Sequence, residues 1–71
     1  MAMFRENREL NAQELHEIAL RIQSDYKATN IRFIEQTNDS CCFRGYKDGA
    51  EYCYKFDKNC TFGSILEDEI V

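Results

Sequence analysis

Four cysteines and one histidine are the residues of this 71-residue sequence whose chemistry is suited to a metal or redox site. Cys41, Cys42, Cys53, Cys60 and His16 together offer enough soft and borderline ligands for a tetrahedral zinc ion. Familiar zinc sites place two cysteines two to four residues apart, whereas the gaps here are zero, ten and six residues. This spacing argues against zinc, and we expect no metal and no other cofactor.

A thiol site is the alternative use of the same cysteines. Cys41 and Cys42 are adjacent, so they project to opposite faces of any strand that contains them. In the hairpin predicted below, Cys42 and Cys53 are diagonal neighbours on one face, and Cys60 could reach them from a loop. A diagonal pair lies near or beyond the Cα separation of a relaxed disulfide. A zinc or thiol module of Cys42, Cys53 and Cys60 therefore remains a secondary hypothesis.

Other catalytic groups do not combine into a recognisable active site. His16 is the only histidine and has no apparent partner, and the sequence contains no glycine-rich loop or Ser-His-Asp set. Glu14 and Glu17 fall where a helix dipole stabilises carboxylates, which explains them without catalysis. We therefore expect that the protein is not an enzyme.

Length and charge limit the classes of function that remain. A chain of this length supports a single small domain over residues 1–71, with residues 1–10 as an arm of mixed charge. Nine basic against 13 acidic residues give a net charge of -4, which disfavours direct binding to nucleic acid. No long apolar run suggests a signal peptide or a membrane span, so we expect a cytoplasmic protein with reduced thiols and no membrane partner.

The first element that must position any site is a helix beginning after Asn11. Asn11 is a favourable N-cap, and Glu14 stands three residues later, as in a capping box. Apolar residues then recur at helical spacing, at positions 15, 18, 19, 22 and 26. The pattern predicts an amphipathic helix of about four turns that ends near residues 27–30.

A β-hairpin that turns at Asp48 and Gly49 is the strongest local signal. Asp-Gly suits a two-residue type I′ turn, and strand-like runs flank it over 41–46 and 50–56. That turn pairs Lys47 with Ala50 and so fixes which side chains share a face. The predicted inward set is Cys41, Phe43, Tyr52, Tyr54 and Phe56. The predicted outward set is Cys42, Arg44, Tyr46, Glu51, Cys53 and Lys55.

Two flanking segments complete the predicted α+β fold. Residues 31–37 form a strand. A two-residue turn after this strand would direct Ile31 and Phe33 to the polar face, whereas an odd loop or a bulge would direct them inward. We favour the odd loop. Ser64 and Glu67 repeat the capping-box pattern and predict a short C-terminal helical turn. The expected fold is one helix packed on a three-stranded antiparallel meander, in the order α-β-β-β-α.

This element order resembles the general layout of double-stranded-RNA-binding domains. Those domains use a basic second helix, whereas the corresponding segment here is Leu66, Glu67, Asp68 and Glu69. The resemblance therefore implies a layout, and RNA binding is not carried over to this chain.

The remaining features favour a protein-binding function. Tyrosine and arginine are typical interface anchors, and the outward hairpin face carries Arg44 and Tyr46 together with Glu51 and Lys55. We expect a non-enzymatic regulator, adaptor or inhibitor that binds another protein through this face and an edge strand, with a homodimer through an edge strand as a related mode. An alternative is an acidic mimic of nucleic acid, using the acidic helix residues and the acidic C-terminus, that blocks a DNA- or RNA-binding protein.

Overall fold

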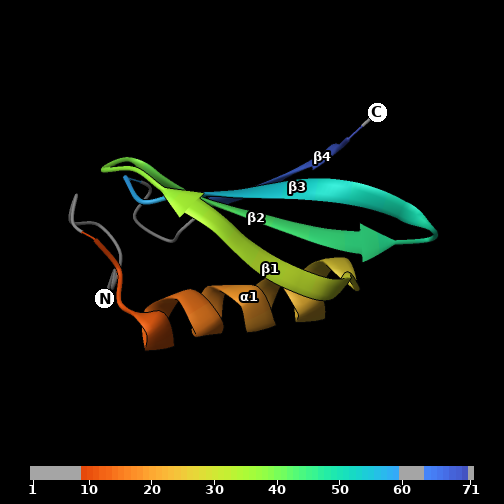
Figure 1. The fold of residues 1–71 in the computed structure, drawn as a ribbon, viewed down its shortest axis with the longest axis horizontal. Coiled ribbons are helices and arrows are strands. Elements are labelled where there is room, and N and C mark those ends of the chain that lie inside the picture. The colour runs from red at the N-terminus through yellow and green to blue at the C-terminus, as the bar shows by residue number, and fades with distance from the viewer. Residues whose placement is uncertain (1–8, 60–63, 71) are drawn as a thin grey trace.

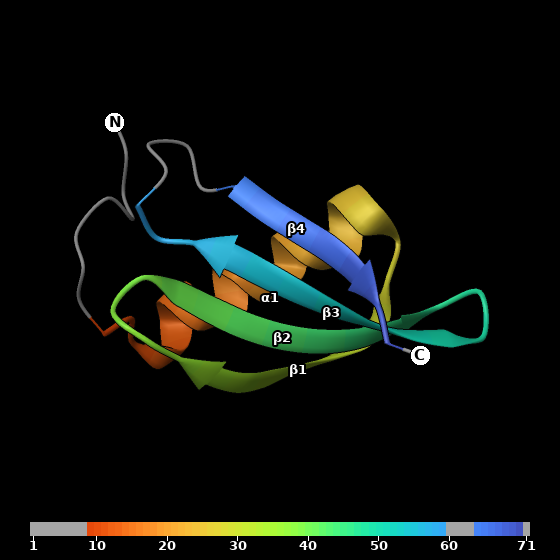
Figure 2. The same cartoon turned by 90° about the horizontal axis from the view of Figure 1, so that it is seen from above.

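One helix and a four-stranded antiparallel sheet make up the fold. The computed structural model describes residues 9–59 and 64–70. Its elements are α1 (Ala12–Tyr26), β1 (Thr29–Gln36), β2 (Ser40–Lys47), β3 (Ala50–Asp57) and β4 (Ser64–Glu69). The strands lie in the order β1-β2-β3-β4, and α1 crosses one face of the sheet (Figures 1 and 2). The predicted α+β class is confirmed, whereas the predicted strand number and C-terminal helical turn are wrong.

The helix begins with the predicted capping box. The Asn11 side chain accepts a hydrogen bond from the Glu14 N–H at 2.9 Å, and the Glu14 carboxylate accepts one from the Asn11 N–H at 3.0 Å. At its other end Lys27 adopts a left-handed conformation with φ 61°, and its N–H bonds to the carbonyl of Gln23. These caps bind backbone groups that a helix end otherwise leaves without partners, so α1 ends where the sequence predicts.

The β2–β3 hairpin follows the predicted register. Asp48 and Gly49 both have positive φ, 54° and 80°, as a type I′ turn requires. Lys47 pairs with Ala50, and the pairs Phe43–Tyr54 and Cys41–Phe56 follow from that turn. The side chains of the two strands therefore divide between a face toward α1, called the inner face, and an opposite outer face.

A bulge in β1, and not an odd loop after it, directs Phe33 toward the inner face. The Thr37 N–H donates to the Ser40 carbonyl at 2.8 Å, which closes a two-residue turn, so the predicted odd loop is wrong. The register then shifts between Phe33 and Glu35, which places Phe33 opposite Phe43 with ring centroids 5.7 Å apart. A bulge supplies the extra residue that a two-residue turn lacks. Phe33 still remains 43% exposed at the sheet edge.

The C-terminal segment forms β4 where the sequence indicated a helical turn. β4 pairs with β3, with Ile65 opposite Phe56 and Glu67 opposite Tyr54. Pairing satisfies backbone groups of β3 between Tyr52 and Asp57, whereas a helix of one or two turns is marginal without packing. β3 is therefore an inner strand, whereas residues 50–56 would be an edge of the expected three-stranded meander, and the edges are β1 and β4. The layout shared with double-stranded-RNA-binding domains is also lost.

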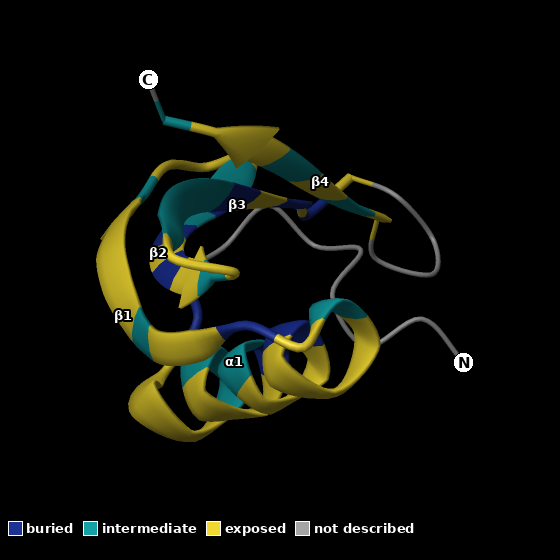
Figure 3. Cartoon of the chain, turned by 90° about the vertical axis from the view of Figure 1, so that its right-hand side faces the viewer, coloured by how far each residue is buried: buried dark blue, intermediate teal, exposed yellow. Residues whose placement is uncertain are grey.

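The hydrophobic core lies between α1 and the inner face (Figure 3). Its buried members are Leu10, Ile18, Ile22, Ala28, Cys41, Phe43, Tyr54 and Phe56. Lys58 is also buried, and its ammonium group donates to Gln36 Oε1 at 2.9 Å and to the Thr37 carbonyl at 2.6 Å. The turn between β1 and β2 is thus tied to the segment after β3. In the described ranges, no helix has the length and apolar character needed to cross a membrane.

Candidate functional site

The outer face of the sheet holds the residues that the sequence marked for binding. Successive pairs place Arg32, Arg44, Cys53 and Asp68 in one row across the four strands. The next row contains Glu35, Cys42, Lys55 and Leu66. α1 covers the opposite side, and Figure 3 shows exposed stretches along β1 and β4. Among residues 9–59 and 64–70, the outer face is therefore an uncovered, mixed surface of charged, apolar and thiol side chains.

An ion cluster organises one part of this face. The Arg32 guanidinium lies 3.0 Å from the Glu51 carboxylate, and the Arg44 guanidinium lies 3.9 Å from the same carboxylate. Arg32 and Arg44 are direct cross-strand partners, so Glu51 offsets the repulsion between two like charges. Of the four predicted binding residues, Glu51 and Arg44 thus belong to this cluster, and Arg44, Tyr46 and Lys55 are exposed.

Two exposed apolar side chains stand on the outer face. Tyr46 is 38% exposed near the hairpin turn, and Leu66 is 65% exposed on β4. Leu66 lies opposite Lys55, one of the predicted residues. The sequence interpretation missed Leu66 because it placed that segment in a helical turn. No strand period in the sequence marks this segment, because Ile65 and Leu66 are adjacent apolar residues and the inward Glu67 is charged.

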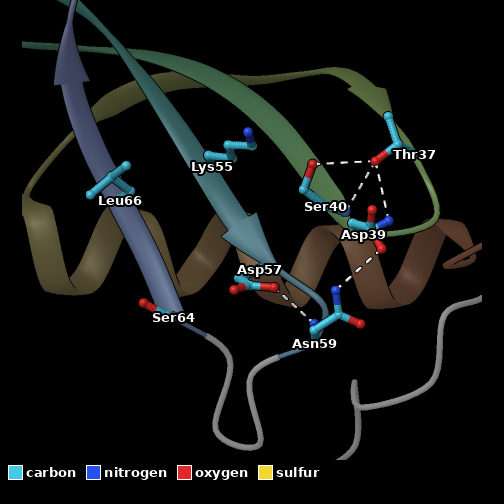
Figure 4. Close-up of a pocket in the computed structure, with 8 residues that line it drawn as sticks. All are labelled: Thr37, Asp39, Ser40, Lys55, Asp57, Asn59, Ser64 and Leu66. Carbon is cyan, nitrogen blue, oxygen red and sulfur yellow. Dashed lines mark hydrogen bonds between the residues drawn. The ribbon is translucent and has the colours of Figure 1, made fainter.

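A shallow depression lies at the end of the outer face, where the β1–β2 turn approaches the segment after β3 (Figure 4). It has a volume of about 610 Å³ and is lined by Thr37, Asp39, Ser40, Lys55, Asp57, Asn59, Ser64 and Leu66. Asn59 ties its two sides together by donating to the carboxylates of Asp39 at 3.2 Å and Asp57 at 2.9 Å. The depression is therefore built from polar groups, with Leu66 and Lys55 connecting it to the rest of the face.

Cys42 and Cys53 meet on the outer face. Their Sγ atoms are 3.3 Å apart, although the two residues are only diagonal neighbours in the register. Burial, followed by the hydrogen bond between the thiols, raises the pKa of Cys42 to about 11. Cys41 faces the core instead, where burial raises its pKa. Cys60 lies outside the described residues.

A second polar cluster lies on the inner face near the hairpin. Glu67 accepts from the Lys47 ammonium at 2.6 Å and from the Tyr54 hydroxyl at 2.8 Å, and Lys47 also stands 5.0 Å from the centre of the Tyr52 ring. The bond to Lys47 lowers the pKa of Glu67, and the bond to Glu67 raises that of Lys47. Burial raises the pKa of Tyr54. Each of these groups has a partner within the cluster, so we interpret the cluster as one that stabilises the sheet.

The described residues bring no metal-binding set together. No three side chains of histidine, cysteine, aspartate or glutamate gather within residues 9–59 and 64–70. His16 is exposed on α1 and lines a small apolar groove against Phe33, away from the thiols. Comparisons of the chain with protein-family models, with curated proteins and with solved structures found no match. The site is therefore interpreted from its own geometry.

Proposed function

We propose that this chain is a non-enzymatic protein-binding module, a regulator, adaptor or inhibitor, that binds its partner through the outer face of the sheet. The observation that carries the proposal is the one-sided covering of the sheet by α1. An antiparallel sheet tolerates water on one face, but its exposed side is then normally polar. Here that side presents the exposed Tyr46 near Arg44 on β2 and the exposed Leu66 on β4, groups that favour burial against another protein.

The chemistry of the face favours a partner with mixed polarity. Leu66 and Tyr46 provide apolar contact area, and the exposed Arg44 provides a planar donor for a carboxylate. The depression next to Leu66 is lined by the carboxylates of Asp39 and Asp57, which suit a basic side chain of the partner. The partner surface is thus expected to combine separate apolar contacts with both acidic and basic groups.

Strand addition at an edge is the weaker part of the earlier hypothesis. β1 carries two register irregularities, and bulges twist an edge away from further pairing. β4 has only six residues and carries Glu67, Asp68 and Glu69, whose charges also discourage pairing. The proposal therefore rests on the outer face, and a homodimer through an edge strand is a secondary mode of association.

The acidic-mimic alternative has less support from the arrangement of charges. Glu67 is paired with Lys47, and Glu14 belongs to the helix cap. On the outer face the bases Arg32, Arg44 and Lys55 interrupt the acids. A mimic of phosphates needs a continuous acidic surface, which these charges do not form. If a partner were nevertheless bound through acidic groups, its binding should weaken steeply as the salt concentration is raised.

The test is an affinity capture that compares the native chain with the double variant Arg44→Ala and Tyr46→Ala. We expect the specific partner signal of the double variant to be lower by about tenfold or more, because two proposed anchors are removed. Quantitative mass spectrometry of the captured proteins gives the readout, with folding of each variant checked by circular dichroism.

The matched control is the double variant Leu20→Ala and Arg21→Ala on α1. Leu20 is 49% exposed and Arg21 is an exposed arginine, so this pair removes similar groups from the other layer of the molecule. Capture should be retained in the control. Equal capture by the native chain and the Arg44 and Tyr46 variant would contradict the proposed surface.

A further inference from the structure

The contact between Cys42 and Cys53 points to thiol chemistry that does not depend on binding of a protein partner. The two thiols are half-buried, so a small molecule can reach them while the surrounding sheet holds them together. Their Sγ atoms, 3.3 Å apart, need to approach by only about 1.3 Å to reach the length of a disulfide bond. No other pair of cysteines in the described part of the chain is placed in this way, since Cys41 faces the core.

We infer that Cys42 and Cys53 form a reversible redox site, which closes to an intrachain disulfide by exchange with a small-molecule disulfide of the glutathione type. In the first step one protein thiolate attacks the small-molecule disulfide, so a mixed disulfide forms and one small thiol leaves. In the second step the other protein thiolate attacks the mixed disulfide, and the second small thiol leaves. Two protein thiols thereby lose two electrons and two protons, which the small-molecule disulfide takes up.

The pair lies among charges of both signs. In the register, Cys42 has Lys55 and Glu35 as its cross-strand neighbours, and Cys53 has Arg44 and Asp68. Oxidised glutathione carries both ammonium and carboxylate groups, so these side chains can contact it during the first step.

The second step follows from the contact between the two thiols. Their Sγ atoms are 3.3 Å apart, so whichever cysteine forms the mixed disulfide, the other lies beside it and can resolve it. Such proximity makes the second step intramolecular and hence fast relative to a second glutathione addition.

Reversibility follows from the diagonal position of the two residues. Diagonal neighbours in antiparallel strands have Cα atoms about 7 to 8 Å apart, whereas relaxed disulfides span at most about 6.8 Å. Closing the bond must therefore draw β2 and β3 together in the middle of the hairpin. A bridge under this strain is easily reduced, so it suits a regulatory rather than a permanent structural link.

The experiment equilibrates the full native chain with mixtures of oxidised and reduced glutathione. Acid quenching, alkylation under denaturing conditions and peptide mass spectrometry then report the state of each cysteine. We expect Cys42 and Cys53 to lose their thiols together as one intrachain link, and to recover them when reduced glutathione is in excess. Cys41 should remain alkylatable throughout.

Two variants separate this site from simple thiol reactivity. Cys42→Ser should leave Cys53 as a stable glutathione adduct, because the resolving thiol is absent. Cys41→Ala should leave the link intact, since Cys41 lies on the other face. The inference is overturned if the native chain keeps both thiols in oxidised glutathione, accumulates glutathione adducts at both residues, or links either residue to Cys60.

Discussion

The two faces of the sheet are built from the same strands but have opposite character. On the inner face Phe43, Tyr54 and Phe56 are fully buried beneath α1. On the outer face their sequence neighbours Arg44, Tyr46 and Lys55 remain exposed. Burial of large side chains drives folding, whereas exposed positions contribute little to it. The inner face therefore carries the stability of the domain, which leaves the outer face available for the recognition and thiol exchange proposed above.

The largest test of this division is truncation of an aromatic residue on each face. Phe43→Ala should lower the free energy of unfolding by about 3 to 5 kcal/mol, because it removes a ring from the core and leaves a cavity. Tyr46→Ala, on the same strand, should lower it by less than about 1 kcal/mol. Urea denaturation followed by circular dichroism measures both values.

A loss of this size can exceed the whole stability of a small domain, so Phe43→Ala can unfold the chain. The milder variant Phe43→Leu keeps the experiment quantitative, with an expected loss of about 1 to 2 kcal/mol. Equal losses for Phe43→Leu and Tyr46→Ala would show that the two faces do not differ as the burial indicates.

The division between the faces was predictable because local residues determine it. Asp48 and Gly49 specify the turn, the turn specifies the register, and the register assigns every side chain of β2 and β3 to a face. The capping box of Asn11 and Glu14 likewise acts within one turn of helix. These signals do not depend on what the rest of the chain does, so the sequence alone was sufficient for them.

Features that depend on distant partners were not predictable in the same way. Ser64 and Glu67 match a helix cap, but the unpaired edge of β3 was available and pairing with it was preferred. The bulge after Phe33 follows from packing against Phe43, which no local pattern encodes. The sequence placed Cys42 and Cys53 on one face but could not give their contact, because rotamers depend on packing.

The pH dependence of the polar cluster on the inner face is the next test. Glu67 has a pKa below its ordinary value because it accepts from Lys47 and Tyr54. Its contribution is therefore fully present above the ordinary glutamate pKa and is lost as pH falls through the folded-state pKa. Glu67→Gln should lower stability at neutral pH by about 1 kcal/mol, since the pair is partly exposed, and the difference from the native chain should disappear as pH falls through the lowered pKa of Glu67.

Urea denaturation at several pH values checks this expectation. Glu69→Gln provides the control, because Glu69 lies on the same strand opposite Tyr52 and is exposed. The control should show a smaller difference from the native chain at neutral pH. A difference for Glu67→Gln that persists unchanged in acid would mean that its carboxylate does not stabilise the fold.

The smallest expected effect concerns the ion cluster on the outer face. Glu51→Gln removes the carboxylate between Arg32 and Arg44, so the two guanidinium groups face each other across β1 and β2. Exposed ion pairs contribute little, and we expect a loss of about 0.5 kcal/mol at low salt. The loss should shrink as salt rises, because the Debye length falls from about 10 Å at 0.1 M to about 3 Å at 1 M. Asp68→Asn removes one charge from the same face without breaking this cluster, and should show less salt dependence. A loss for Glu51→Gln as large as that for a core truncation would mean that the outer face also supports the fold, and that substitutions there could not separate binding from stability.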